Sequence, residues 1–325
     1  MTAAIAPAQW AGFVRREYLE GFIRDGGATI KFCVPLEEAA RAATWSALSL
    51  TGQELGYVVL KLDAATTKVH LLDEVFFHLA NQIDWLALVD AVMKKLCQRE
   101  GYEPPDTGQS PFYQRVAEKN RVSPDLVRMD LRRALDSAVF RRGDLTKDFR
   151  VAMTQLCRAL LSDVEEGGAI LRTITDWLTG KNRSAAPLRP YLIFNRVTRS
   201  NARRLLESLL RWIVTAGFPG TLLLVDLARL AVARNPRDGK LYYTAGNLLE
   251  AFEVLREFID STDRLAHCLI AAFPETSFVD DSSGRGMAKY WALNIRVSDE
   301  VRVREMVNPM AALVRLSTNA PEVPP

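Results

Sequence analysis

The chain has 325 residues, of which 48% are hydrophobic and 25% are charged, which is the composition of an ordinary globular protein. Its net charge is only +3, from 42 basic and 39 acidic residues, so total charge gives little indication of nucleic-acid binding. No apolar run approaches membrane-spanning length, and the amino terminus lacks a charged segment followed by an apolar core. We therefore expect a soluble, cytoplasmic protein without a membrane partner.

The first part of the chain predicts a strand–helix–strand unit. A helix over residues 10–24 precedes a strand at 28–34, a helix at 37–53 and a strand at 57–63. Strands that are joined by a single helix pair in parallel, because the chain must cross over the sheet to return. This unit indicates a parallel sheet.

A long helical region follows, over residues 73–199. Its apolar residues recur at the spacing of one helix face, and proline and glycine separate the segments. The predicted helices span residues 73–99, 123–140, 147–164 and 169–178. A helix at 200–216 then leads back toward the sheet.

The carboxyl-terminal part again alternates strands and helices. The strands are predicted at residues 220–227, 267–273, 290–297 and 311–316, with a helix at 241–259. The whole pattern predicts an α/β fold in one domain, with a core at 10–72 and 200–318 and the helical region at 73–199 as an insertion.

The strand at 220–227 is a continuous apolar run that ends in a carboxylate, Asp226. A carboxylate at that position holds magnesium in nucleotide-hydrolysing proteins (Walker B), and an acidic neighbour orients the attacking water. Here the next residue is Leu227. Asp226 is therefore either a relic magnesium ligand or a strand-end carboxylate that binds a neighbouring turn.

A phosphate-binding loop (Walker A) would lie between the first strand and the first helix. Such a loop needs glycines, whose successive N–H groups surround the phosphates, followed by lysine and then serine or threonine. The chain has Pro35, Glu37 and Glu38 in the loop, with Arg41 and Ala42 at the lysine and hydroxyl positions. The segment favours an ordinary helix start over a nucleotide site.

Other patterns point to contacts or exclude chemistry. Arg203 and Arg204 lie in a basic helix that fits either DNA or partner contact or a solvated face. Arg285, between two glycines, fits a partner contact or a flexible loop. The three histidines do not cluster, which argues against a metal site, and there is no GxSxG motif. Four widely spaced cysteines predict reduced, buried thiols: Cys33, Cys97, Cys157 and Cys268.

Several stretches in a fixed order resemble the ATP-binding P-loop proteins of BREX-type bacteriophage-exclusion systems. They are Trp177-Leu178-Thr179-Gly180, Asn201-Ala202-Arg203, the run from Gly217 to Asp226, Leu255-Arg256-Glu257-Phe258-Ile259-Asp260, Pro274-Glu275-Thr276-Ser277-Phe278 and Val314-Arg315-Leu316. The resemblance implies an AAA+-like or RecA-like P-loop core, usually oligomeric, in anti-phage defence. Arg285 and Arg296 match family positions that would meet a neighbouring subunit.

The chain departs from this family where chemistry is required, at Arg41, Ala42 and Leu227. We therefore expect a catalytically inactive, ATPase-like subunit without a bound cofactor. Its expected partners are other subunits of a defence complex, including an intact ATPase, a further copy of itself or DNA. The alternatives are an atypical ATPase that binds ATP and magnesium and is completed by a partner subunit, or a DNA-binding adaptor of the same system.

Overall fold

The computed structural model describes residues 4–108, 110–279, 283–298 and 307–321. The chain forms two compact units, residues 1–75 with 218–325, and residues 76–217. The first unit contains α1 (Pro7–Phe13), β1 (Ala28–Pro35), α2 (Glu38–Glu54), β2 (Val58–Asp63), β3 (Thr221–Leu227), α10 (Ala245–Asp260), β4 (Cys268–Pro274), α11 (Trp291–Val297) and β5 (Leu313–Leu316).

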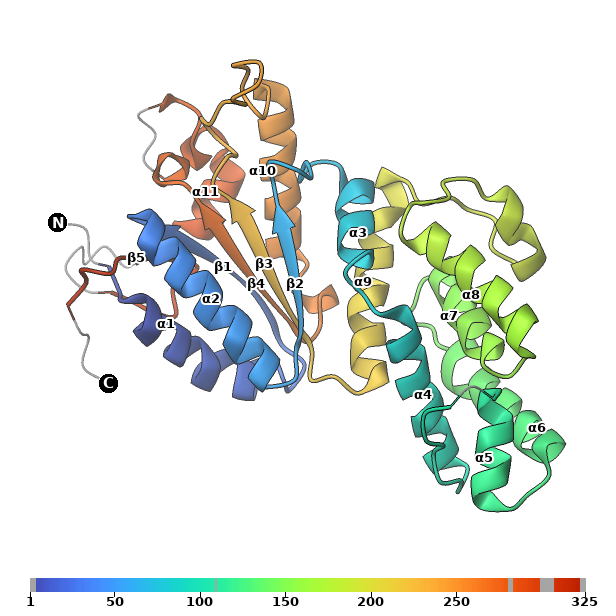
Figure 1. The fold of residues 1–325 in the computed structure, drawn as a ribbon. Coiled ribbons are helices and arrows are strands. Elements are labelled where there is room, and N and C mark those ends of the chain that lie inside the picture. The colour runs from blue at the N-terminus through green and yellow to red at the C-terminus, as the bar shows by residue number, and fades with distance from the viewer. Residues whose placement is uncertain (1–3, 109, 280–282, 299–306, 322–325) are drawn as a thin grey trace. The chain divides into compact units, whose positions relative to one another are not determined.

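The five strands form one parallel sheet in the order β2-β3-β4-β1-β5 (Figure 1). This confirms the predicted α/β class with a parallel sheet. The strands β3 and β4 are almost wholly buried, which explains why they read as continuous apolar runs rather than as alternating ones. The consecutive strands β1 and β2 are not neighbours, because β4 and β3 lie between them.

Both faces of the sheet are covered. On one face, α1, α2 and the π-helical segment Val14–Phe22 pack through Trp10, Leu19 and Leu48 against Leu222 and Leu269 (Figure 1). On the other face, Phe32 of β1 stacks on Phe278 at 5.5 Å between ring centroids, and Phe278 meets Phe252 of α10 edge-on at 5.8 Å. Each of these aromatic side chains removes a large apolar area from water.

A charged residue of β1 lies inside this core. Lys31 of β1 is 4% exposed, and its ammonium group lies 4.7 Å from the centre of the Tyr18 ring. The amine donates to the carbonyl oxygens of Met310 and Ala311, which precede β5. Burial lowers the pKa of Lys31 to about 8, because the charged form loses its hydration.

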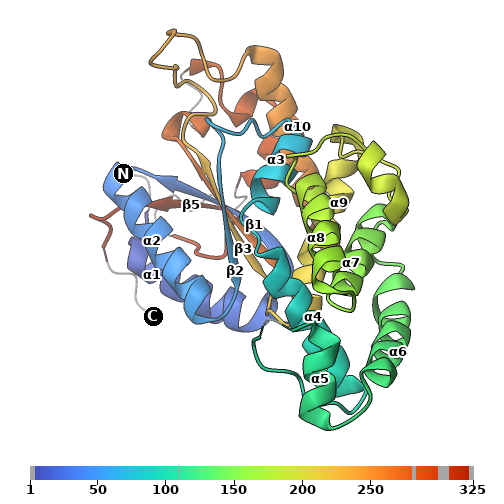
Figure 2. The same cartoon turned by 45° about the vertical axis from the view of Figure 1, so that its right-hand side comes forward.

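The second unit is helical (Figure 2). It contains α4 (Trp85–Arg99), α5 (Phe112–Asn120), α6 (Pro124–Leu135), α7 (Lys147–Ala159), α8 (Val164–Leu178) and α9 (Arg199–Ala216), and α3 (Leu72–Ala80) crosses from the first unit into it. The unit ends at Gly217 rather than at residue 199, because α9 packs against α4 and α7. Within the described residues, no helix has the length and apolarity to cross a membrane.

Two predicted elements were wrong. The helix expected at 73–99 is two helices, because the chain turns after α3 and Asp84 caps α4 by accepting a hydrogen bond from the backbone N–H of Ala87 at 2.9 Å. The strand expected at 290–297 is helix α11. Leu293 and Val297 are buried, whereas Ile295 between them is 46% exposed, so burial does not alternate as it would along a strand. All four cysteines are free and buried, as predicted.

Candidate functional site

The carboxyl ends of four parallel strands meet at one edge of the sheet, where open α/β proteins bind their ligands. At this edge Asp63 ends β2 and lies directly opposite Asp226 of β3 in the strand register. Pro35 ends β1, and Pro274 ends β4. The edge therefore brings together the ends of β1 and β3, the two segments that the sequence analysis compared with the Walker A and Walker B motifs.

The connection from β1 to α2 consists of only two residues, Leu36 and Glu37. The N–H of Leu36 donates to the carbonyl of Leu316 at 2.9 Å, which continues the pairing of β1 with β5. The Glu37 carboxylate accepts from the backbone N–H of Thr318 and from its hydroxyl at 2.8 Å. The backbone hydrogen bond from Thr318 lowers the pKa of Glu37. The connection is thus held against the end of the chain's last strand.

This short connection excludes a phosphate loop of the usual form. A P-loop needs six positions, from its first glycine to its last, as an open loop in front of the helix. Here Pro35 is still in the strand, and α2 begins at Glu38, so Glu38, Arg41 and Ala42 all lie in the helix. The backbone N–H groups of Ala40 and Arg41 donate to the carbonyl of Glu37 and are not available to phosphates.

Arg41 joins α2 to the ends of two strands. Its side chain is 10% exposed, and Nη1 donates to Oδ1 of Asp226 at 3.0 Å and to the carbonyl of Phe273 at 2.8 Å. Nη2 donates to the carbonyl of Pro274 at 3.2 Å. Nε lies 3.4 Å from a carboxylate oxygen of Glu38, one turn earlier on α2. The guanidinium group therefore lies beside the Asp226 carboxylate, near the end of β3.

Asp226 has a further bond of its own. Its Oδ1 also accepts from the backbone N–H of Ala228 at 2.8 Å, which forms a tight turn after β3. The next residue, Leu227, is fully buried and pairs with Pro274 across the strands. A side chain at position 227 points into the core and cannot orient a water molecule above the sheet edge. This placement agrees with the expectation that Asp226 binds a neighbouring turn.

The side chain of Arg285 binds backbone carbonyls of the first unit, to which it belongs. Nε donates to the carbonyl of Ala231 at 2.6 Å, and Nη2 donates to the carbonyl of Tyr243 at 2.7 Å. Both carbonyls belong to the connection between β3 and α10. The neighbouring Gly286 is required here, because a Cβ atom would lie 2.8 Å from the carbonyl oxygen of Ser277. The contact of Arg285 with a partner stays a prediction.

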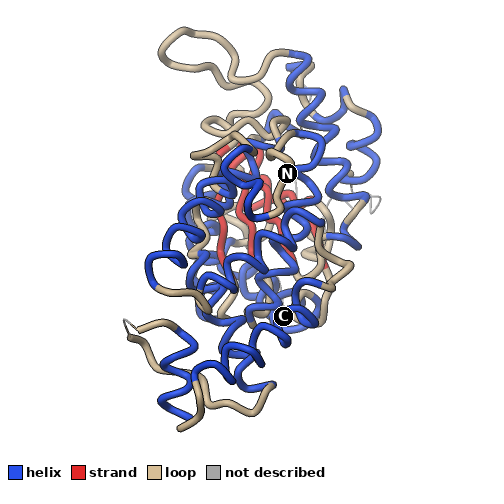
Figure 3. Tube along the Cα trace, turned by 90° about the vertical axis from the view of Figure 1, so that its right-hand side faces the viewer, coloured by secondary structure: helices blue, strands red, loops and turns tan. Residues whose placement is uncertain are grey.

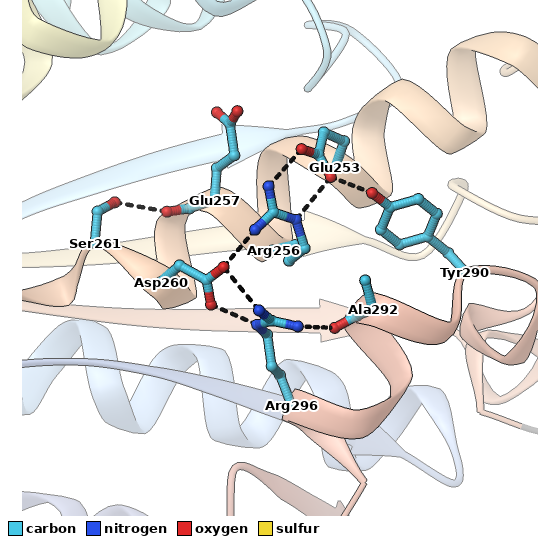
Figure 4. A network of polar contacts seen from close by, with 8 residues as sticks. All are labelled: Glu253, Arg256, Glu257, Asp260, Ser261, Tyr290, Ala292 and Arg296. Atoms are coloured by element: carbon cyan, nitrogen blue, oxygen red, sulfur yellow. Dashed lines mark hydrogen bonds and ion pairs between the residues drawn. The ribbon is translucent and has the colours of Figure 1, made fainter.

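Arg296 takes part in an ion-pair network between α10 and α11 (Figure 4). Its guanidinium binds both oxygens of Asp260, with Nη2 at 3.0 Å from Oδ2. Arg256 joins Asp260 to Glu253, which also accepts from the hydroxyl of Tyr290. The hydrogen bonds from Arg256 and Tyr290 lower the pKa of Glu253 to about 2. Arg296 thus stabilises the packing of α11 in this structure.

Arg203 and Arg204 lie on α9, in the helical unit. Arg203 is partly covered and lies 3.6 Å from the buried carboxylate of Glu207, whereas Arg204 is exposed. The two neighbours on the helix therefore face different surroundings, and only Arg204 presents its charge fully to solvent. Their contact with DNA or a partner stays a prediction.

Two residues at the sheet edge escaped the sequence reasoning. Glu275 follows β4, and its Oε1 accepts from the backbone N–H groups of Ala231 and Val232 at 2.8 and 3.0 Å. Lys68 lies over the rings of Tyr242 and Tyr243 at 5.2 and 4.5 Å. The adjacent tyrosines Tyr242 and Tyr243, which follow a basic segment, were the only hint of this contact in the sequence. Their partner Lys68 lies too far away in the chain to be found from a local pattern.

The described part of the chain contains no group of three histidine, cysteine or acidic side chains that could hold a metal ion. In comparisons with known proteins, no family model matches the chain, and no curated protein or solved structure is significantly similar to it. The chemistry of the site therefore has to be inferred from its own geometry.

Proposed function

We propose that this protein is a catalytically inactive, ATPase-like subunit of a bacterial anti-phage defence complex, in which it has a structural or regulatory role. The observation that carries the loss of catalysis is the replacement of the phosphate loop by a two-residue connection, with Arg41 bound to Asp226. A positively charged guanidinium beside the carboxylate opposes the binding of a magnesium ion at the same place.

The strand order supports an AAA+-like or RecA-like ancestry. In those classes the strand before the phosphate loop and the strand that bears the magnesium-binding carboxylate are not neighbours, because another strand lies between them. Here β4 lies between β1 and β3 in the same way. The order of the sequence stretches that resemble BREX-type ATP-binding proteins supports the assignment to a defence system.

A role in assembly is supported by the exposed apolar residues of α11. Trp291 is 71% exposed and Ile295, one turn later, is 46% exposed. A large exposed aromatic side chain with an apolar neighbour is typical of a protein contact. Both residues come shortly before Arg296 on α11. The family resemblance assigns the position of Arg296 to a contact with a neighbouring subunit. The proposed partner is an intact ATPase subunit of the same complex.

Isothermal titration calorimetry with ATP and magnesium tests the loss of catalysis. We expect no magnesium-dependent heat of binding from the wild type. Binding that is present in the wild type and abolished by Asp226→Ala would contradict the proposal, because that carboxylate would then be a working magnesium ligand. ATP hydrolysis that appears only with a partner and depends on Asp226 would instead support an atypical ATPase.

Co-purification with an intact ATPase encoded by a neighbouring gene tests the assembly role. Trp291→Ala is expected to weaken the complex at least tenfold, because aromatic contacts dominate interface energies. Leu50→Ala is the matched control, since Leu50 is 58% exposed on α2 and lies in a different element. Equal effects of the two substitutions would refute the assignment of the contact to α11.

A further inference from the structure

The connection between β3 and α10 is long for a link within a compact α/β unit. It runs over residues 228–244, whereas most such connections have about four to six residues. In Figures 2 and 3 it projects beyond the ends of the strands, and in Figure 3 it is the tan loop at the top of the view. Long ordered connections of this kind are frequently functional.

The outer part of this connection is a β-hairpin, residues 233–242. Arg234 and Leu241 form an antiparallel bridge. The backbone N–H of Tyr242 donates to the carbonyl of Ala233 at 3.2 Å, and that of Asn235 donates to the carbonyl of Lys240 at 2.8 Å. The turn closes at Gly239, whose φ of 66° lies in the left-handed region that glycine adopts readily. The hairpin therefore has a defined geometry.

Two charged, partly buried side chains hold the first stem of the hairpin. The Glu275 carboxylate accepts from the N–H groups of Ala231 and Val232, and Arg285 donates to the carbonyl of Ala231. These are charge-assisted hydrogen bonds, which are roughly twice as strong as neutral ones. A charged side chain from each of two later segments thus fixes the start of the hairpin.

The second stem is held as firmly. Tyr243 is fully buried, and its hydroxyl donates to the carbonyl of Ala64 at 2.8 Å and accepts from the N–H of Val69 at 3.0 Å. Burial raises the pKa of Tyr243 to about 12. Lys68 donates to the carbonyl of Tyr242. Both stems are anchored, so the tip is presented in a fixed direction.

The tip is basic. Arg234, Arg237 and Lys240 are all exposed, against a single acidic residue, Asp238. The carboxylate of Asp238 accepts from the backbone N–H of Lys240 at 3.1 Å, so its position is set by the turn. At the base, the Arg229 guanidinium lies 5.4 Å from the ring centre of Tyr242 and donates to its hydroxyl. Positive charge is therefore concentrated at the projecting end.

We infer that the hairpin at 233–242 binds double-stranded DNA through its phosphates. A two-stranded β-ribbon fits the major groove of B-DNA, and the planar guanidinium groups of arginine bind phosphate oxygens in pairs. A protein partner is less consistent with this surface, because residues 233–242 contain no large apolar side chain with high exposure to form the centre of an interface. The regular spacing of phosphates suits a tip whose exposed side chains are mainly cationic.

This inference concerns a surface different from the Arg41–Asp226 pair, so it stands or falls separately from the loss of catalysis. The test is fluorescence anisotropy with a labelled DNA duplex of about 20 base pairs, titrated at several salt concentrations. The variant Arg234→Gln, Arg237→Gln, Lys240→Gln removes the three exposed charges. If each contacts one phosphate, the slope of log K against log salt should decrease in magnitude by about 2.7.

A second triple variant is the matched control. Arg132→Gln, Arg133→Gln and Arg141→Gln remove three exposed charges at α6 and just after it, in the helical unit. We expect the hairpin variant to weaken DNA binding at least tenfold, because it removes three proposed phosphate contacts. The control should leave DNA binding within about twofold, because its three charges lie outside the proposed contact surface. Circular dichroism should be unchanged in both variants.

Several outcomes would overturn the inference. They are the absence of DNA binding by the wild type, an unchanged salt slope in the hairpin variant, and an equal loss of binding in the control variant. Poly-glutamate of matched charge is added as a competitor. If poly-glutamate displaces the labelled duplex as effectively as unlabelled DNA does, the surface recognises acidic protein rather than nucleic acid.

Discussion

Replacing Arg41 by methionine tests the central feature of the site. Methionine keeps an unbranched apolar stem but removes the cation that donates to Asp226, Phe273 and Pro274. Breaking a fully buried ion pair costs about 3–5 kcal/mol. Asp226 is 33% exposed and regains part of its hydration, whereas the two strand-end carbonyls lose their partner. We therefore expect a loss of about 2–4 kcal/mol in the free energy of unfolding.

Urea unfolding gives the size of the effect, and hydrogen exchange locates it. The chain has two units, so a single two-state transition cannot be assumed. Exchange of the backbone amides of β3 and β4 should accelerate in Arg41→Met, because these strands lose their link to α2. Arg204→Met is the control. Its side chain is exposed on α9, and the change should be within about 0.5 kcal/mol.

A double-mutant cycle with Asp226→Asn separates the ion pair from the carbonyl contacts. We expect a coupling energy between Arg41 and Asp226 of about 1–2 kcal/mol. The reasoning would be refuted if Arg41→Met changed stability no more than Arg204→Met does. A coupling energy close to zero would show that the guanidinium acts through the carbonyls of Phe273 and Pro274 alone.

Gly286→Ala should destabilise the first unit by about 1–3 kcal/mol, because the added Cβ atom would overlap backbone oxygen atoms. Gly246→Ala is the control and should not destabilise it, because there is open space around Gly246. Urea unfolding midpoints compare the two variants. Burial lowers the pKa of Lys31 from its ordinary value of 10.5 to about 8 in the folded protein, so the unfolded chain binds more protons between pH 8 and pH 10.5 and wild-type stability rises there. Lys31→Met should abolish that rise, worth up to about 3 kcal/mol, when unfolding is measured from pH 7 to 10.5. The pKa of Glu253 is about 2, against an ordinary value of 4.5, so its stabilisation is present above pH 4.5 and is lost on acidification toward pH 2. Between pH 7 and pH 3, the free energy of unfolding from urea titrations should fall less in Glu253→Gln than in the wild type, by a difference of less than about 1 kcal/mol.

The sequence alone determined the class of fold. The apolar runs at β3 and β4 required burial on both faces, and the strand–helix–strand pattern required parallel pairing, so the α/β class followed from local physics. The absence of glycine near Arg41 and of an acidic residue at position 227 was also visible in the sequence. Where periodicity was short, it misled: the seven residues of α11 read as a strand because two buried positions do not distinguish the two periods.

Only the tertiary structure decided what the charged residues do. Arg41 is 185 positions from Asp226, and Arg285 is 54 positions from Ala231, so neither contact leaves a local pattern. Periodicity reports which face of an element is buried, whereas the strand order and the partner of each guanidinium depend on long-range packing. The same limit applies to the basic hairpin at 233–242, whose charges are legible in the sequence but whose anchored, projecting geometry is set by Lys68, Glu275 and Arg285.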